Sequence, residues 1–172
     1  MLMGIVCTAI TTMLVLVLLG GAVHKIVSVS RLASAAAKLA GVPLELGGIP
    51  SFSSFLCEIA AATAILYPPT RHFGFAAAAA LWGTYAALSW RANRRGEKFD
   101  CGCCFTLAAP RGGRWPIWRS AILALCAAGA ALLSGDPVFE LPPLLAGIGF
   151  LGLLFAADGI AAVPLAAGRL PE

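Results

Sequence analysis

The segment formed by residues 4–23 holds no charged side chain and is long enough, as a helix, to cross the hydrocarbon core of a bilayer. Four further apolar segments follow, so that the set covers residues 4–23, 52–67, 73–90, 117–133 and 143–165. In lipid each segment must satisfy its own backbone hydrogen bonds, which a helix does internally. The sequence therefore predicts one all-α domain over residues 1–172, a polytopic membrane helix bundle.

Between the first two segments, residues 26–50 are less apolar, and their apolar positions recur at helical spacing: Ile26, Val29, Leu32, Ala33, Ala36 and Leu39. This pattern predicts an amphipathic helix at the membrane interface, followed by a turn region from Pro43 to Pro50. Pro68-Pro69 should stop the second spanning helix. We expect five spans, and a bundle of four spans with one re-entrant segment stays open.

Composition excludes a water-soluble domain, because 60% of the residues are hydrophobic, 12% are charged and the mean hydropathy is +0.90. The net charge of +4 is no sign of nucleic-acid binding, because it follows the helix ends. Gly147, Gly149 and Gly152 match a dinucleotide fingerprint in spacing alone, since no strand precedes them. These glycines predict a close-packing helix face instead.

The basic residues predict an orientation. With five spans, eleven of the 12 lysine and arginine residues would share one side of the membrane, and Arg71 would lie alone on the other. Basic residues near helix ends are retained in the cytoplasm. The N-terminus is therefore expected outside and the charged loop, residues 91–116, in the cytoplasm. Lys25 should snorkel to the interface from the end of the first helix. Tyr85, Trp90 and Trp115 suit the same boundary.

That charged loop contains the three residues whose side chains are most suited to redox chemistry, Cys101, Cys103 and Cys104. They form a C-x-C and a C-x-x-C pair, so that one thiol has two near neighbours. A disulfide in such a short segment should be strained, and strained, accessible disulfides are the labile or catalytic ones. The spacing favours a thiol–disulfide redox centre over zinc, which needs four ligands wrapped around the ion. Inert, reduced thiols are a further alternative.

The charges around the cysteines act in both directions. Arg94, Arg95 and Lys98 should favour the thiolate, which is the reactive form, whereas Asp100 disfavours it. Within the spans, Glu58 and Asp158 are expected about two turns from the inner ends of their helices, at the depth of His24. Glu58 or His24 could then handle protons during cysteine redox chemistry. Alternatively, Glu58 pairs with Lys25, His24 or Arg119 and holds helices together.

These residues carry a resemblance to a family. The sequence Gly20-Gly21-Ala22-Val23-His24-Lys25 ends the first helix, Glu58 lies in the second, and Asp100-Cys101-Gly102-Cys103 follows a basic hairpin. Over roughly residues 4–135 the chain resembles the MauE family of methylamine utilisation proteins, which is related to DoxX-like redox-associated membrane proteins. Cys104-Phe105-Thr106 departs from the family pattern, which usually has a glycine-containing turn there.

The resemblance implies a multi-pass protein of the bacterial inner membrane that is needed for maturation and disulfide formation of the methylamine dehydrogenase small subunit. A thioredoxin-like protein would act beside it. The relationship to DoxX-like proteins suggests a quinone as cofactor. The resemblance carries over Cys101 and Cys103 as the redox pair and His24 and Glu58 as motif positions without an assigned role. From the residues themselves, we expect Cys104 to act as a resolving thiol and Arg95 and Asp100, like His24 and Glu58, to be supporting residues.

Two other functions stay open, a non-catalytic scaffold or transport factor for a maturation partner and a quinone-linked oxidoreductase subunit. A conflict also follows, because the client is periplasmic whereas the charge pattern places the cysteines in the cytoplasm. Either electrons cross the bundle, through Cys57 or a quinone, or the orientation is reversed.

Overall fold

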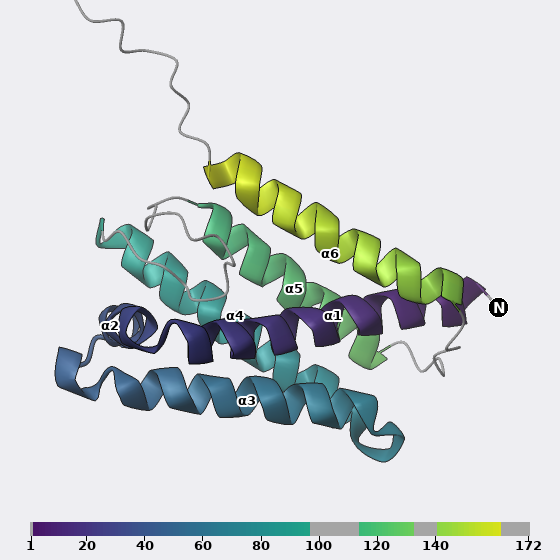
Figure 1. The fold of residues 1–172 in the computed structure, drawn as a ribbon, viewed down its shortest axis with the longest axis horizontal. Coiled ribbons are helices and arrows are strands. Elements are labelled where there is room, and N and C mark those ends of the chain that lie inside the picture. Colours follow the sequence, from purple (N-terminus) through teal and green to yellow (C-terminus); the bar gives the residue numbers. More distant parts are fainter. Residues whose placement is uncertain (1, 97–113, 133–140, 163–172) are drawn as a thin grey trace, which may run out of the picture.

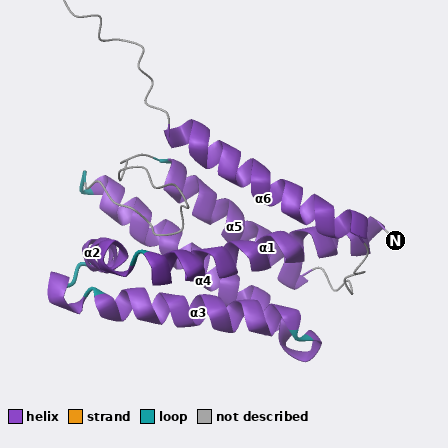
Figure 2. Cartoon of the chain, viewed as in Figure 1, coloured by secondary structure: helices purple, strands orange, loops and turns teal. Residues whose placement is uncertain are grey.

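The computed structural model describes residues 2–96, 114–132 and 141–162, and the regular structure in these ranges is entirely helical (Figure 2). The elements in chain order are α1 (Leu2–Val27), α2 (Val29–Ala40), η1 (Leu44–Leu46), α3 (Gly48–Leu66), η2 (Pro68–Thr70), α4 (Arg71–Arg94), α5 (Trp115–Leu132) and α6 (Leu141–Ala162). The predicted all-α bundle is confirmed, and each predicted span coincides with one long helix.

The long helices lie side by side along the molecule, and α2 lies across one end of them (Figure 1). Helix α4 packs against α5 and α3, whereas α1 packs against α6 and α3. The last turn of α1, helix α2 and the first turn of α3 form what we call the α2 end of the bundle. Helix α4 ends and α5 begins at this same end, which is opposite the N-terminus (Figure 1).

Within the described ranges, four segments are long and apolar enough to cross a membrane: Gly4–Val27, Leu44–Leu66, Trp115–Leu132 and Leu141–Asp158. Helix α4 is less apolar but has 24 residues, which corresponds to about 36 Å at the α-helical rise. It returns antiparallel to α3 after the short η2 turn, as Pro68-Pro69 predicted. The protein is thus a multi-pass membrane helix bundle, and its described part contains four apolar spans with a fifth long helix between two of them.

Two predicted boundaries are wrong in an instructive way. Helix α1 continues past His24 and Lys25 to Val27. Lys25 is buried within it and not exposed at the interface. Helix α3 begins at Gly48, four residues before the predicted start at Phe52. Pro50 therefore lies in the first turn of α3 and not in a loop, since a proline there disrupts no hydrogen bond within the helix.

The predicted amphipathic helix is shorter than the segment that suggested it. Helix α2 occupies Val29–Ala40, and Gly41 ends it with a left-handed φ of 72°. Its Leu32 and Ala37 are buried against the bundle, whereas Val29 is exposed. The pattern of Leu32 and Ala37 inside and Lys38 outside confirms an amphipathic helix that covers the α2 end.

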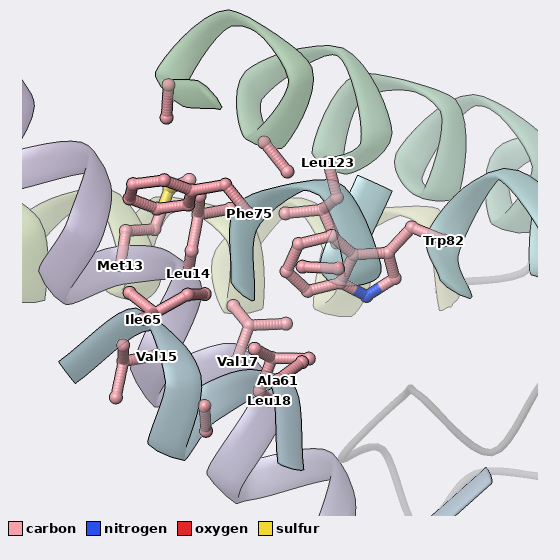
Figure 3. Packing of buried hydrophobic residues seen from close by; sticks show 14 residues of the cluster. Met13, Leu14, Val15, Val17, Leu18, Ala61, Ile65, Phe75, Trp82 and Leu123 are labelled. Carbon is pink, nitrogen blue, oxygen red and sulfur yellow. The ribbon is translucent and has the colours of Figure 1, made fainter. Parts of the chain in front are cut away.

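The apolar core lies where α1, α3, α4 and α5 meet (Figure 3). Trp82 and Phe75 of α4 are its largest fully buried side chains, and they pack with Leu14 and Leu18 of α1 and Ile65 of α3. These residues are no more than 1% exposed. The apolar surface outside this core faces outward, which suits a bundle whose solvent is lipid.

Helix α6 packs along α1 and approaches it closely at one glycine. A β-carbon on Gly147 would lie 2.7 Å from Thr12 Cβ and 2.8 Å from the Ala9 carbonyl oxygen, so the two backbones approach closely there. At Gly149 and Gly152 a β-carbon would meet nothing within 4 Å. The predicted close-packing glycine face is therefore confirmed at Gly147 alone.

Candidate functional site

The proposed redox cluster itself, Asp100, Cys101, Cys103 and Cys104, lies outside the described residues. The structure does describe both flanks of the loop that carries it. Helix α4 ends at Arg94 and α5 begins at Trp115, both at the α2 end of the bundle (Figure 1). The two chain segments that lead into the cysteine loop are therefore fixed to the same end of the molecule.

Arg95 connects the start of this loop to α2. Its Nη2 donates a hydrogen bond of 3.4 Å to the carbonyl oxygen of Lys38, in the last turn of α2. The neighbouring Arg94 guanidinium lies 5.1 Å from the centre of the Trp90 ring, a cation–π contact. Two of the cations that were expected to stabilise a thiolate, Arg94 and Arg95, thus lie where the loop begins, and Arg95 also forms a contact between helices.

Below this end, the bundle contains a buried ion pair. Lys25 Nζ of α1 lies 2.6 Å from Glu58 Oε1 of α3, and the two side chains are 7% and 3% exposed. Helical side chains tilt toward the N-terminus of their own helix. Because α1 and α3 are antiparallel, Lys25 and Glu58 tilt toward each other along the bundle. The expected snorkelling of Lys25 is wrong, and the expected pairing with Glu58 is confirmed.

Two further residues complete the surroundings of the Glu58 carboxylate. Tyr85 of α4 donates its hydroxyl to Glu58 Oε1 at 3.2 Å, and Lys25 Nζ lies 5.6 Å from the Tyr85 ring centre. Gly21 of α1 leaves the space for the carboxylate, since a β-carbon there would lie 3.1 Å from Oε1. Glu58 Oε2 is buried without a hydrogen-bond partner in the described part of the chain. Three helices therefore meet at one carboxylate.

This carboxylate is deeper than predicted. Glu58 lies ten positions after Gly48, the first residue of α3, which corresponds to about 15 Å along the helix. Because α3 starts earlier than its apolar run suggested, Glu58 is near the middle of the helix rather than two turns from its end. His24, the other candidate for proton handling, is half-buried and directly precedes Lys25.

A second buried ion pair joins α5 to α6. Arg119 Nη1 lies 2.5 Å from Asp158 Oδ2, and the two side chains are 5% and 3% exposed. Trp115 donates its indole N–H to Asp158 Oδ1 at 2.8 Å. Trp115 begins α5, so this network lies at the α5 flank of the cysteine loop. Trp115 is thus a hydrogen-bond donor to a buried acid and not simply an interfacial aromatic.

The three described cysteines have different surroundings. Cys7 is buried at 2% exposure in α1, Cys57 is exposed on α3, and Cys126 is half-buried in α5. Cys57 directly precedes Glu58, and consecutive residues of a helix point about 100° apart, so the thiol lies on the outer face while the carboxylate points inward. An exposed thiol within an apolar span faces lipid.

Sequence reasoning missed Tyr85 as a partner of Glu58, although a signal was present. The buried positions of α4 recur at spacings of three, four and seven: Phe75, Ala78, Trp82, Ser89 and Ala92. Tyr85 falls in the same series and therefore on the same inward face. A tyrosine on a buried helix face needs a partner for its hydroxyl, and Glu58 was the acid within reach.

Chemically, both networks hold an acid and a base together in a medium that would not tolerate either charge alone. The Glu58 network also joins a carboxylate, an ammonium and a phenol by short contacts, which is an arrangement able to relay protons. Both networks tie together helices that reach the α2 end, so they set the geometry of the helices that carry the cysteine loop.

The comparisons with curated proteins and with solved structures find no match. The family model described as methylamine utilisation protein MauE matches residues 3–133, which include α1 through α5, the loop with Cys101 and Cys103, and the Lys25–Glu58 pair. The match covers about three quarters of the 172 residues and leaves α6 outside it. This membrane helix bundle therefore belongs to the MauE family.

Proposed function

We propose that this protein is a membrane thiol–disulfide redox factor that matures an exported amine dehydrogenase small subunit. Membership in the MauE family suggests a role in methylamine utilisation, and it is the observation that carries the proposal. The family match includes Asp100-Cys101-Gly102-Cys103, the sequence that favours thiol–disulfide exchange. The two helix ends that flank the loop lie at the same end of the bundle, which supports a redox centre at the membrane surface.

In the proposed reaction, a Cys101–Cys103 disulfide oxidises two thiols of the client. A client thiolate attacks one sulfur of this disulfide and forms a mixed disulfide, and the second client thiolate then displaces the protein's cysteine. The client gains one disulfide, and Cys101 and Cys103 take up the two electrons as thiols, with the client's two protons. Cys104 would act as a resolving thiol that releases a mixed disulfide that has stalled.

The pair must then be reoxidised by loss of two electrons and two protons. We assign this step to the disulfide of a thioredoxin-like partner or to a membrane quinone, since each accepts both. Arg95, held against α2, and the neighbouring Arg94 would stabilise the thiolate form of the cluster. The protein would work in the bacterial inner membrane. The charge pattern favours an N-terminus outside and the cysteine loop in the cytoplasm, whereas direct exchange with a periplasmic client requires the reverse orientation.

Replacement of Cys101 and Cys103 by serine tests the proposal in cells that make the client. Loss of client disulfides and of active amine dehydrogenase, with unchanged amounts of the membrane protein, is the expected result. Cys126→Ser is the matched control, because Cys126 lies eleven positions into α5 and has no assigned role, and it should leave maturation intact. Full maturation without Cys101 and Cys103 would instead identify a non-catalytic scaffold.

Sidedness is tested separately by alkylation of intact cells with a membrane-impermeant and a permeant maleimide. If the cluster is cytoplasmic, its reduced thiols react with the permeant reagent and not with the impermeant one. Cysteines that form a disulfide react with neither reagent. Reaction of Cys101 and Cys103 with the impermeant reagent would reverse the proposed orientation and would place the cluster beside a periplasmic client.

A further inference from the structure

A cavity of about 80 Å³ lies at the α2 end, beside the Lys25–Glu58 pair. Four helices line it: α1 provides Lys25, α2 provides its apolar face with Leu32 and Leu39, α3 provides Ser51, and α4 provides Tyr85 and Ser89. A single water needs roughly 10–15 Å³ of such space, so the cavity has room for a group larger than one water. Its wall is mostly apolar.

Ser89 is the polar group in this wall that most needs a ligand. It is fully buried, and its hydroxyl has no hydrogen-bond partner among the described residues. A buried hydroxyl is normally satisfied, because it loses its hydrogen bonds to water when it leaves solvent. Since Ser89 lines the cavity, a ligand there could accept a hydrogen bond from its hydroxyl. A ligand with a carbonyl oxygen would complete this hydrogen bond.

The charges around the cavity argue that the ligand is uncharged. The Lys25 ammonium already contacts Glu58 Oε1 at 2.6 Å, so the positive charge in the wall is balanced by an adjacent negative one. An anion would have to compete with Glu58 for Lys25, and a cation would meet the ammonium. A lysine ammonium has three N–H donors, however, so Lys25 can still donate to a neutral oxygen.

A larger cleft of about 180 Å³ adjoins the cavity. Lys25 and Ser51 line both spaces, so the two are neighbours. The outer cleft is otherwise walled by apolar side chains, among them Ile26 and Phe52, which are 62% and 62% exposed. An apolar chain could lie in this cleft while a polar end group entered the inner cavity.

We propose that the cavity between α1, α2, α3 and α4 binds the carbonyl-bearing end of an uncharged, membrane-soluble molecule, with Ser89 as hydrogen-bond donor and the outer cleft holding its apolar chain. A lipid-soluble quinone has this chemistry. The inference concerns binding alone, requires only described helices, and stands whether or not Cys101 and Cys103 exchange electrons. Loss of client maturation and loss of ligand binding are therefore separate results.

The ligand class is tested with the full chain in zwitterionic lipid discs, by thermal unfolding against ligand concentration. The probes are a decyl-substituted benzoquinone and decylbenzene, which share the alkyl chain and a six-membered ring and differ in the carbonyls. A ligand that binds the folded state raises the midpoint in a saturable way. We expect the quinone to bind about ten-fold more tightly than decylbenzene, because only the quinone satisfies Ser89.

The site is tested with two serine variants. Ser89→Ala should weaken quinone binding by about five-fold, the effect of one neutral hydrogen bond. Ser120→Ala is the matched control, because Ser120 is also buried and its hydroxyl has no partner in the described ranges, but it lines neither space. This variant should leave binding unchanged. Ala36→Leu, which fills the cavity from α2, should abolish binding.

Three results would overturn the inference. The first is equal binding of the quinone and decylbenzene, which would show an unselective apolar cleft. The second is equal quinone binding by the Ser89→Ala and Ser120→Ala proteins. The third is displacement of the quinone by small amounts of phosphatidylglycerol, which would identify Lys25 as an anion site for lipid headgroups.

Discussion

Gly21 of α1 lies against the carboxylate of Glu58 of α3, so closely that a β-carbon on Gly21 would be 3.1 Å from Oε1 and 3.3 Å from Oε2. The missing side chain lets a buried acid fit between two packed helices. Lys25, one helical turn further along α1, then reaches the same carboxylate. The second half of α1 therefore provides both the space for Glu58 and the charge that balances it.

Removal of the charge on Lys25 should destabilise the bundle strongly. Lys25→Met leaves Glu58 buried without its cation, and we expect the free energy of unfolding to fall by about 3–5 kcal/mol. The double variant Lys25→Met/Glu58→Met should recover most of this loss, because neither charge remains. Equilibrium unfolding in detergent micelles measures both values.

Lys38→Met is the control for this cycle, because Lys38 is an exposed lysine on α2, and its side chain should contribute within about 0.5 kcal/mol. A Lys25→Met protein as stable as the Lys38→Met protein would show that the Lys25–Glu58 pair contributes nothing to the fold.

Asp158 should hold the last helix to the family-matched part of the bundle. Helix α6 packs mainly along α1, and Asp158 adds an ion pair with Arg119 and a hydrogen bond from Trp115. Asp158→Asn removes the buried negative charge that Arg119 contacts, so we expect a loss of about 3 kcal/mol in the free energy of unfolding.

Trp115→Phe keeps the ring and removes only the N–H, so it should cost less, about 1.5–3 kcal/mol for a hydrogen bond to a charged group. Protease susceptibility of α6, followed by mass spectrometry, reports on its detachment. Equal resistance of the Asp158→Asn and unaltered proteins would contradict the assigned role.

Gly147 and Gly149 should respond oppositely to the same change. Gly147→Ala places a methyl group 2.8 Å from the Ala9 carbonyl oxygen, which forces α6 away from α1 and should cost about 1–3 kcal/mol. Gly149→Ala meets nothing within 4 Å and should stabilise the helix by about 0.5–1 kcal/mol through backbone entropy. Thermal unfolding of the two variants gives the comparison, and the same sign for both would refute the close contact.

Cys57 should react with lipid-soluble reagents alone. Its thiol is exposed within an apolar span, whereas Cys7 is 2% exposed in the bundle interior. In a protein with all other cysteines replaced, Cys57 should be labelled by an apolar maleimide dissolved in the membrane and spared by a charged one. A single-cysteine Cys7 protein should resist both until it is unfolded. Labelling of Cys57 by the charged reagent would place it in an aqueous channel.

Much of the fold could be predicted from the sequence, because few structures are tolerated in lipid. Long apolar runs must form helices there, and Pro68-Pro69 and Gly41 end helices by local backbone constraints. The start of α3 could not be predicted from apolarity, because Gly48 and Pro50 were expected in a turn. Helix α3 includes them because the turn between α2 and α3 packs tightly against α2. The Ala33 carbonyl leaves no room for a β-carbon at Gly47.

For the candidate site, the sequence identified the acid but not the whole of its surroundings. Glu58 was recognised because an intramembrane charge needs a partner, and Lys25, His24 and Arg119 were all eligible. Tyr85 was read as an interfacial aromatic, since its role depends on which way α4 faces. The cysteine cluster lies outside the described residues, so its pairing remains a prediction.

The sequence by itself determined an all-helical membrane bundle and its family, because backbone hydrogen bonding in lipid and a local cysteine motif depend on neighbours along the chain. Only the tertiary structure decided that Lys25 pairs with Glu58, 33 positions away, and Arg119 with Asp158, 39 positions away. Such pairs depend on which helix faces meet and at what depth, and those are set by close approaches such as Gly21 and Gly147 that act across the bundle.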